Sequence, residues 1–87
     1  MTGAALAATD QAPHQHLDRA LLVDLLWALA TPEFGIQHLW AATEPGRARL
    51  IIFADGVDEH SAALAGRRLC EAAVGSAPQL RGWYVLP

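Results

Sequence analysis

The segment Leu17–Ala30 constrains this chain more than any other, because it predicts a helix that is apolar on almost every side. At about 100° per residue, leucines and alanines surround the helix axis, and only Asp18, Arg19 and Asp24 are charged. A helix of this kind is normally buried on more than one side. It is too short for a membrane span, which needs about 20 residues, so we expect its second face to meet another protein surface.

The composition shows the same surplus of apolar residues. Of 87 residues, 53% are hydrophobic and 17% are charged. A chain of this size hides only about 60–65% of its unfolded surface, so we expect one small domain with a thin core. The net charge of −3 argues against nucleic acid and against an anionic membrane as partners. Cys70 is the only cysteine, which excludes a disulfide within the chain.

The N-terminal segment carries no targeting signal that we can identify. Residues 1–15 contain no arginine or lysine, whereas a secretory signal requires a basic segment. All six basic residues of the chain are arginine, a bias associated with GC-rich bacterial genomes, and we expect a bacterial cytoplasmic protein. We predict a flexible tail over residues 1–15 and a single α+β domain over 16–87. The alternative is a weak first strand at Gly3–Thr9, although alanine is a poor strand former.

A β-hairpin is predicted after the first helix. The runs Ile36–Thr43 and Ala48–Ala54 contain β-branched and aromatic residues, and a Pro-Gly turn separates them. Both faces of the second run are apolar, which is typical of a strand that is covered on both sides.

A second helix and a last strand complete the prediction. The helix spans Asp58–Val74, with Asp55 or Asp58 as its N-cap. Its expected apolar stripe consists of Leu64, Ala65, Leu69 and Ala72. The last strand spans Arg81–Leu86 and follows a helix stop at Gly75–Pro78.

The predicted fold is therefore α+β, with the helices on one face of the sheet. The order is αββαβ, or βαββαβ if Gly3–Thr9 pairs, which gives a partial or complete ferredoxin-like sandwich. A right-handed crossover should place the last strand parallel to the strand that precedes it in the sequence.

The large apolar residues are the candidates for contact with a partner, although each of them could equally belong to the core. The interface residues that we predict are Leu22, Leu26, Trp27, Trp40, Ile51, Phe53 and Trp83. A second set, His38, Trp40 and Tyr84, could line a small-molecule pocket.

The remaining reactive side chains predict no catalytic or metal site. His14 and His16 form an H-x-H pair that supplies two of the four ligands of a zinc site, without evident further ligands. His60 lies near two carboxylates, but no nucleophile motif accompanies it. For Cys70 we expect an inert thiol on the helix side away from Leu64 and Ala65. We expect no cofactor.

One stretch resembles a known family. Residues 22–54 contain an apolar helix, the strand entry Phe34-Gly35-Ile36 and the turn Glu44-Pro45-Gly46 before an apolar strand. This pattern is similar to ACT domains, especially those in regulatory subunits of acetolactate synthase. The resemblance implies a ferredoxin-like fold and pairing through sheets or helices. ACT domains carry a glycine-containing acidic loop before the first helix, whereas this chain has AATDQAPHQHLD there, so no ligand residues are carried over.

Three functions follow from these patterns. The first is a small non-catalytic module that forms a homo-oligomer or docks onto a larger protein. The second is an ACT-like regulatory domain that binds a small metabolite at a subunit interface. The third is a small dimeric ferredoxin-like enzyme with an aromatic or polyketide-like substrate, which needs a cavity of about 300 Å³ or more.

Overall fold

The chain folds in the order βαββαβ, the longer of the two predicted orders. A computed structural model describes residues 1–54 and 58–87. Its elements are β1 (Thr2–Ala8), α1 (Arg19–Leu29), β2 (Ile36–Glu44), β3 (Arg47–Ala54), α2 (Glu59–Ser76) and β4 (Trp83–Val85), with short 3-10 helices at Pro32–Phe34 and Pro78–Leu80.

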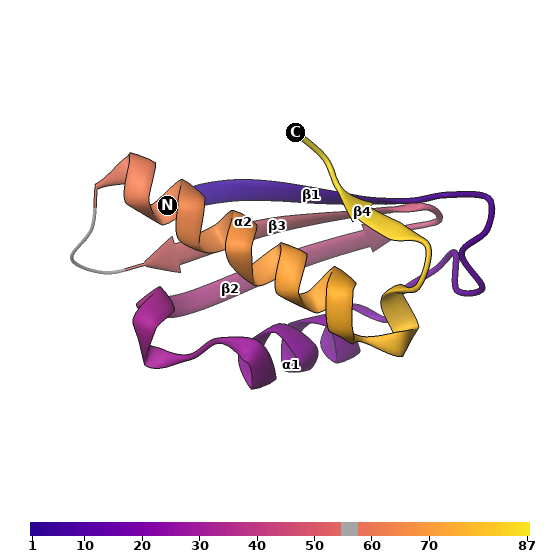
Figure 1. Ribbon diagram of the computed structural model, residues 1–87, viewed down its shortest axis with the longest axis horizontal. Coiled ribbons are helices and arrows are strands. Elements are labelled where there is room, and N and C mark those ends of the chain that lie inside the picture. Colours follow the sequence, from indigo (N-terminus) through magenta and orange to yellow (C-terminus); the bar gives the residue numbers. More distant parts are fainter. Residues whose placement is uncertain (55–57) are drawn as a thin grey trace.

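The four strands form one antiparallel sheet in the order β2-β3-β1-β4. β1 is antiparallel to both β3 and β4, so β4 runs parallel to β3 with β1 between them, as the crossover rule predicts. Both helices lie on one face of this sheet (Figure 1). The α+β class is confirmed, and the arrangement is compatible with a ferredoxin-like fold.

The N-terminal segment, for which we expected a flexible tail, contains the strand β1 near the middle of the sheet. Thr2–Ala7 pairs with β3, and Leu6–Ala8 pairs with β4. Pairing on both sides overrides the weak strand propensity of alanine, because propensity is a smaller effect than burial and cross-strand contact. The loop that follows is also fixed, since the Trp83 indole donates a hydrogen bond of 2.7 Å to the His14 carbonyl oxygen.

Helix α1 buries a narrower stripe than its composition suggests. Asp18 is its N-cap and accepts a hydrogen bond of 3.1 Å from the backbone N–H of Leu21. Leu22 and Leu26 are buried in the core, whereas Leu21 and Trp27 are exposed. The prediction that Leu22 and Leu26 form a partner interface is therefore wrong, because these side chains already fill the interior of one chain.

Helix α2 turns a stripe of small residues toward the sheet. Asp58 caps it through a hydrogen bond of 2.7 Å from the backbone N–H of Ser61, and this contact lowers the pKa of Asp58. Asp55, the other candidate cap, lies outside the described residues. Of the predicted stripe only Leu69 is buried, and Leu64 is exposed. The residues that are buried on α2 are Ala62, Gly66, Leu69, Cys70 and Ala73.

The predicted hairpin is confirmed, and its alternation determines the core. In β3, Ala48, Leu50 and Ile52 are buried under the helices, and the residues between them lie on the opposite face. Trp83 of β4 is likewise a core residue, which corrects its assignment to a partner interface. The helix-facing side of the sheet is thus filled by one chain alone.

The assignment of Leu26 to the core predicts its mutational cost. Leu26→Ala should lower the free energy of unfolding by about 2–5 kcal/mol, because it leaves a cavity in a fully buried site. Leu21→Ala, on the exposed side of the same helix, should cost less than about 1 kcal/mol. Urea denaturation followed by circular dichroism measures both. Equal costs would place the core elsewhere on α1.

Two glycines should respond to alanine with opposite signs. Gly82 has φ +82°, and an added Cβ would lie 2.7 Å from Cα of Ala12, so Gly82→Ala should lower stability by about 1–3 kcal/mol. At Gly75 in α2 an added Cβ meets nothing within 4 Å, so Gly75→Ala should raise stability by up to about 1 kcal/mol. Thermal unfolding of the two variants checks the signs. A neutral Gly82→Ala would show that the loop before α1 does not pack against β4 in solution.

Candidate functional site

The side of the sheet that carries no helix is the candidate functional surface, and we call it the open face. The cross-strand register places Trp40 opposite Ile51, and Ile51 opposite Gly3, so these three form one row across β2, β3 and β1. The row beside it consists of Ala42, Arg49 and Ala5. Outside these two rows, His38, Phe53 and Tyr84 belong to the same face.

Several large apolar side chains on the open face remain in contact with solvent. Trp40 is 41% exposed, Phe53 is 38% exposed and Ile51 is half-buried. The rings of His38 and Phe53 lie 5.6 Å apart at an angle of 50°, a tilted cross-strand pair. These residues gather on the β2–β3 half of the face, whereas β1 contributes only Gly3 and Ala5 to the middle of the face.

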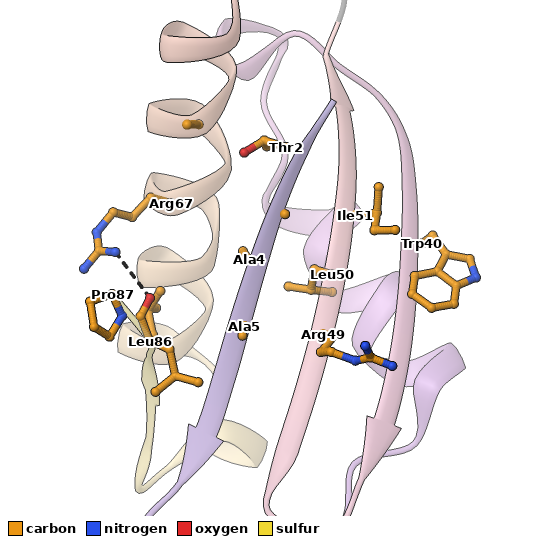
Figure 2. Close-up of a pocket in the computed structure, with 13 residues that line it drawn as sticks. Thr2, Ala4, Ala5, Trp40, Arg49, Leu50, Ile51, Arg67, Leu86 and Pro87 are labelled. Atoms are coloured by element: carbon orange, nitrogen blue, oxygen red, sulfur yellow. Dashed lines mark hydrogen bonds between the residues drawn. The ribbon is translucent and has the colours of Figure 1, made fainter.

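Arg49 is the charged residue in the middle of the open face. Its two cross-strand neighbours are Ala5 and Ala42, which offer no counter-charge. Among the side chains that the structure describes, the only salt bridge joins Arg67 to Glu71 on α2, at 2.9 Å. The side chain of Arg49 extends from β3 toward β2, where Trp40 lies (Figure 2). The face therefore presents a cation beside an indole ring.

The open face contains a groove of about 510 Å³ that crosses β3 and β1 and ends against α2 (Figure 2). Gly3 and Ala5 lie beneath it, and Trp40 and Ile51 lie along one side. The groove exists because these two residues of β1 have almost no side chain and because β4 pairs only with Leu6–Ala8. Toward the other edge it meets the C-terminal residues 86–87 and the side of α2.

The predicted ligand residues do not form a single site. His38 and Trp40 lie on β2, and Tyr84 lies on β4, at the opposite edge of the sheet. Three strand spacings of about 4.8 Å separate these edges. Only Trp40 of the three lines the large groove, and the structure brings it together with Arg49 and Gly3 instead. The sequence showed Arg49 on this strand face, but the expectation of a flexible tail hid the contribution of Gly3 and Ala5.

A smaller groove of about 320 Å³ lies between α1 and β2, where Val23 and Asp24 face residues 38–41. It holds two of the candidates for the enzyme hypothesis, His38 and Trp40, but not Tyr84. His38 is exposed and its described ring contact is with Phe53, so no general base and nucleophile pair is formed there.

The other three histidines are exposed. His14 and His16 lie in the loop before α1, and His60 lies in the first turn of α2. No group of three or more His, Cys, Asp or Glu side chains comes together among the residues that the structure describes. In the same part of the chain, no helix is long and apolar enough to cross a membrane.

Comparisons with protein-family models, with curated proteins and with solved structures find no match for this chain.

Cys70 is buried in the core, not on the outer side of α2 as we had expected. Loss of solvent raises the pKa of its thiol to about 11 from the ordinary value of 9.0, and Glu71 adds to the increase. A thiol with this pKa holds little thiolate at neutral pH, which makes it a poor nucleophile.

The raised pKa of Cys70 predicts a pH effect on stability. The unfolded thiol loses its proton near pH 9, whereas the folded thiol keeps it up to about pH 11. Stability is therefore fully present below pH 9 and should fall as pH rises through this window. Urea denaturation between pH 8 and 11 measures the decline, and Cys70→Ala should show a shallower one. Identical pH profiles for the two proteins would contradict the assignment.

Proposed function

We propose that this chain is a small non-catalytic assembly module of ferredoxin-like fold, and that its open face packs against the open face of a second copy. The observation that carries the proposal is the exposure of Trp40 and Phe53 on a sheet face that no helix covers. Contiguous exposed apolar surface of this kind marks interaction sites in small proteins. Sheet-on-sheet packing is a standard way to bury it.

The size of the open face suits a modest dimer. Four strands about 4.8 Å apart and eight residues about 3.3 Å long give a projected area of about 500 Å². Because side chains protrude from the sheet, the accessible area of such a face is larger than its projected area. It approaches the roughly 800 Å² that each partner buries in a standard interface. A dimer at the low end of this range should dissociate at micromolar concentration.

The shape of the face favours a second copy of the same chain as the partner. Bulky side chains cover the β2–β3 half of the face. Gly3 and Ala5 have almost no side chain, so the β1 half of the face is hollowed. When a two-fold axis runs parallel to the strands between the two sheets, the β2–β3 half of each copy packs against the β1 half of the other. Ile51 of one copy then lies above Gly3 of the other. The Arg49 side chain extends toward the edge strand β2 (Figure 2), so its guanidinium lies over the β2–β3 half of this contact.

The resemblance to ACT domains remains part of this proposal. The strand β1 ahead of α1 supplies an element that such domains require, and it supports the ferredoxin-like assignment. A regulatory role with a metabolite at the subunit interface is the alternative function, and the groove on the open face is the observation that favours it.

Two tryptophans with the same exposure provide a matched test. Trp40 on the open face and Trp27 on α1 are both 41% exposed. Trp40→Lys should weaken the dimer by at least about tenfold, because it places a charge in the apolar contact. Trp27→Lys should leave the dimer unchanged. Light scattering over a concentration series gives the mass of each variant, and circular dichroism checks its folding.

Two results would contradict the proposal. A wild-type chain that remains a 9.3 kDa monomer at high micromolar concentration would exclude the dimer. Dissociation by Trp27→Lys but not by Trp40→Lys would move the interface from the sheet to α1.

A further inference from the structure

We infer that the groove on the open face is a binding site for an aromatic carboxylate, with Arg49 as the residue that holds the anionic group. The site belongs to one chain and does not require the proposed dimer.

The volume and walls of the groove fit a small flat ligand. Its volume of about 510 Å³ lies within the range of roughly 300–1,000 Å³ that is usual for small-molecule sites. The indole of Trp40 and the side chain of Ile51 provide apolar walls, and the backbone at Gly3 and Ala5 can be approached closely. An added Cβ at Gly3 would meet only the Leu50 carbonyl oxygen, at 3.8 Å, which shows how open this position is.

The charge of the groove selects an anion. Among the described residues, the charged side chains that line it are Arg49 and Arg67, and the C-terminal residue Pro87 lies on the Arg67 side of the groove, away from Arg49 (Figure 2). Arg67 is already engaged, because its Nε lies 2.9 Å from a Glu71 oxygen and its Nη1 donates to the Leu86 carbonyl oxygen at 3.4 Å. Figure 2 shows Arg67 turned toward the C-terminal residues and Arg49 turned toward Trp40. Arg49 is therefore the cation that can bind a carboxylate, to which a guanidinium can donate two parallel hydrogen bonds.

Arg49 and the apolar walls of the groove lie side by side on the open face. Arg49 occupies the row next to that of Trp40, Ile51 and Gly3, between two alanines that leave space around it. The Arg49 guanidinium lies on the β2 side of β3, so a carboxylate bound to it directs its aromatic ring across β3, past Ile51, toward Gly3 and Ala5. A neutral or cationic ligand of the same shape loses the arginine contact.

Binding should compete with assembly, and this consequence rests on the proposed function. Trp40 and Ile51 line the groove and also belong to the face that would meet a second copy. A ligand that occupies the groove excludes the partner from the same surface. An excess of ligand should therefore increase the fraction of monomer.

A titration with 2-naphthoate tests the site, with 2-naphthamide as its neutral counterpart. In ¹⁵N spectra the indole N–H signal of Trp40, assigned with Trp40→Phe, should shift on addition of 2-naphthoate. The signals of Trp27 on α1 and of Trp83, whose indole donates to His14 in the interior, should not shift. The amide should bind at least about fivefold more weakly than the acid, because it lacks the charge-assisted contact.

Variants separate the arginine from general apolar binding. Arg49→Gln should lower the affinity for 2-naphthoate about five- to tenfold and remove the preference over the amide, whereas Arg81→Gln, outside the groove, should change neither. Gly3→Leu should abolish binding of both compounds by filling the hollow. Equal affinities of wild type and Arg49→Gln, or no Trp40 shift at millimolar 2-naphthoate, would overturn the inference.

Light scattering on the same samples separates this inference from the proposed dimer. A monomeric wild type whose Trp40 signal shifts with 2-naphthoate supports the site and contradicts the dimer. A dimer that neither binds 2-naphthoate nor loses mass in its presence contradicts the site and leaves the dimer intact.

Discussion

The number of helices determines how much of this sheet one chain can cover. Two packed helices, each about 10 Å wide, match the width of four strands spaced about 4.8 Å apart, so they cover one face completely. Here both helices lie on the same face (Figure 1), and Leu22 and Leu26 of α1 belong to one buried cluster with the inward side chains of the sheet. No helix or strand of residues 1–54 and 58–87 covers the opposite face of the sheet. Its exposed tryptophan and phenylalanine follow directly from this arrangement.

Burial on the covered face depends on small residues as much as on large ones. Gly66 lets α2 approach so closely that an added Cβ would lie 3.0 Å from Ile52 and 3.1 Å from Thr2. The alanines of β1 and α2 have the same effect along the contact. The thin core of a small chain can be closely packed in this way, because small residues let its helix and sheet approach without leaving voids. The alanine content that weakens the sequence signal is thus what lets the helix lie close to the sheet.

The sequence predicts most of the elements but not their partners. The hairpin, both helices and the cap at Asp58 are confirmed because periodicity, turn residues and capping are local properties. The strand β1 was the weaker alternative, since its stability comes from β3 and β4, which are distant in the sequence. The same reason explains why Leu22, Leu26 and Trp83 were assigned to a partner interface. In a sequence, an apolar residue of the core cannot be distinguished from one of an interface until its neighbours in space are known. The groove could not be predicted either, because it forms only when sheet pairing brings Gly3 and Ala5 of β1 near Trp40 of β2.

The central claim is that a second copy covers the open face. The most direct measurement is a set of isotope-filtered NOEs between labelled and unlabelled copies in one sample. We expect intermolecular contacts from the side chain of Ile51, and from the ring of Trp40 in the same row, to the β1 strand of the other copy near Gly3. Intermolecular contacts confined to Leu21 and Trp27 of α1, or none at concentrations where the sample is dimeric by mass, would contradict it.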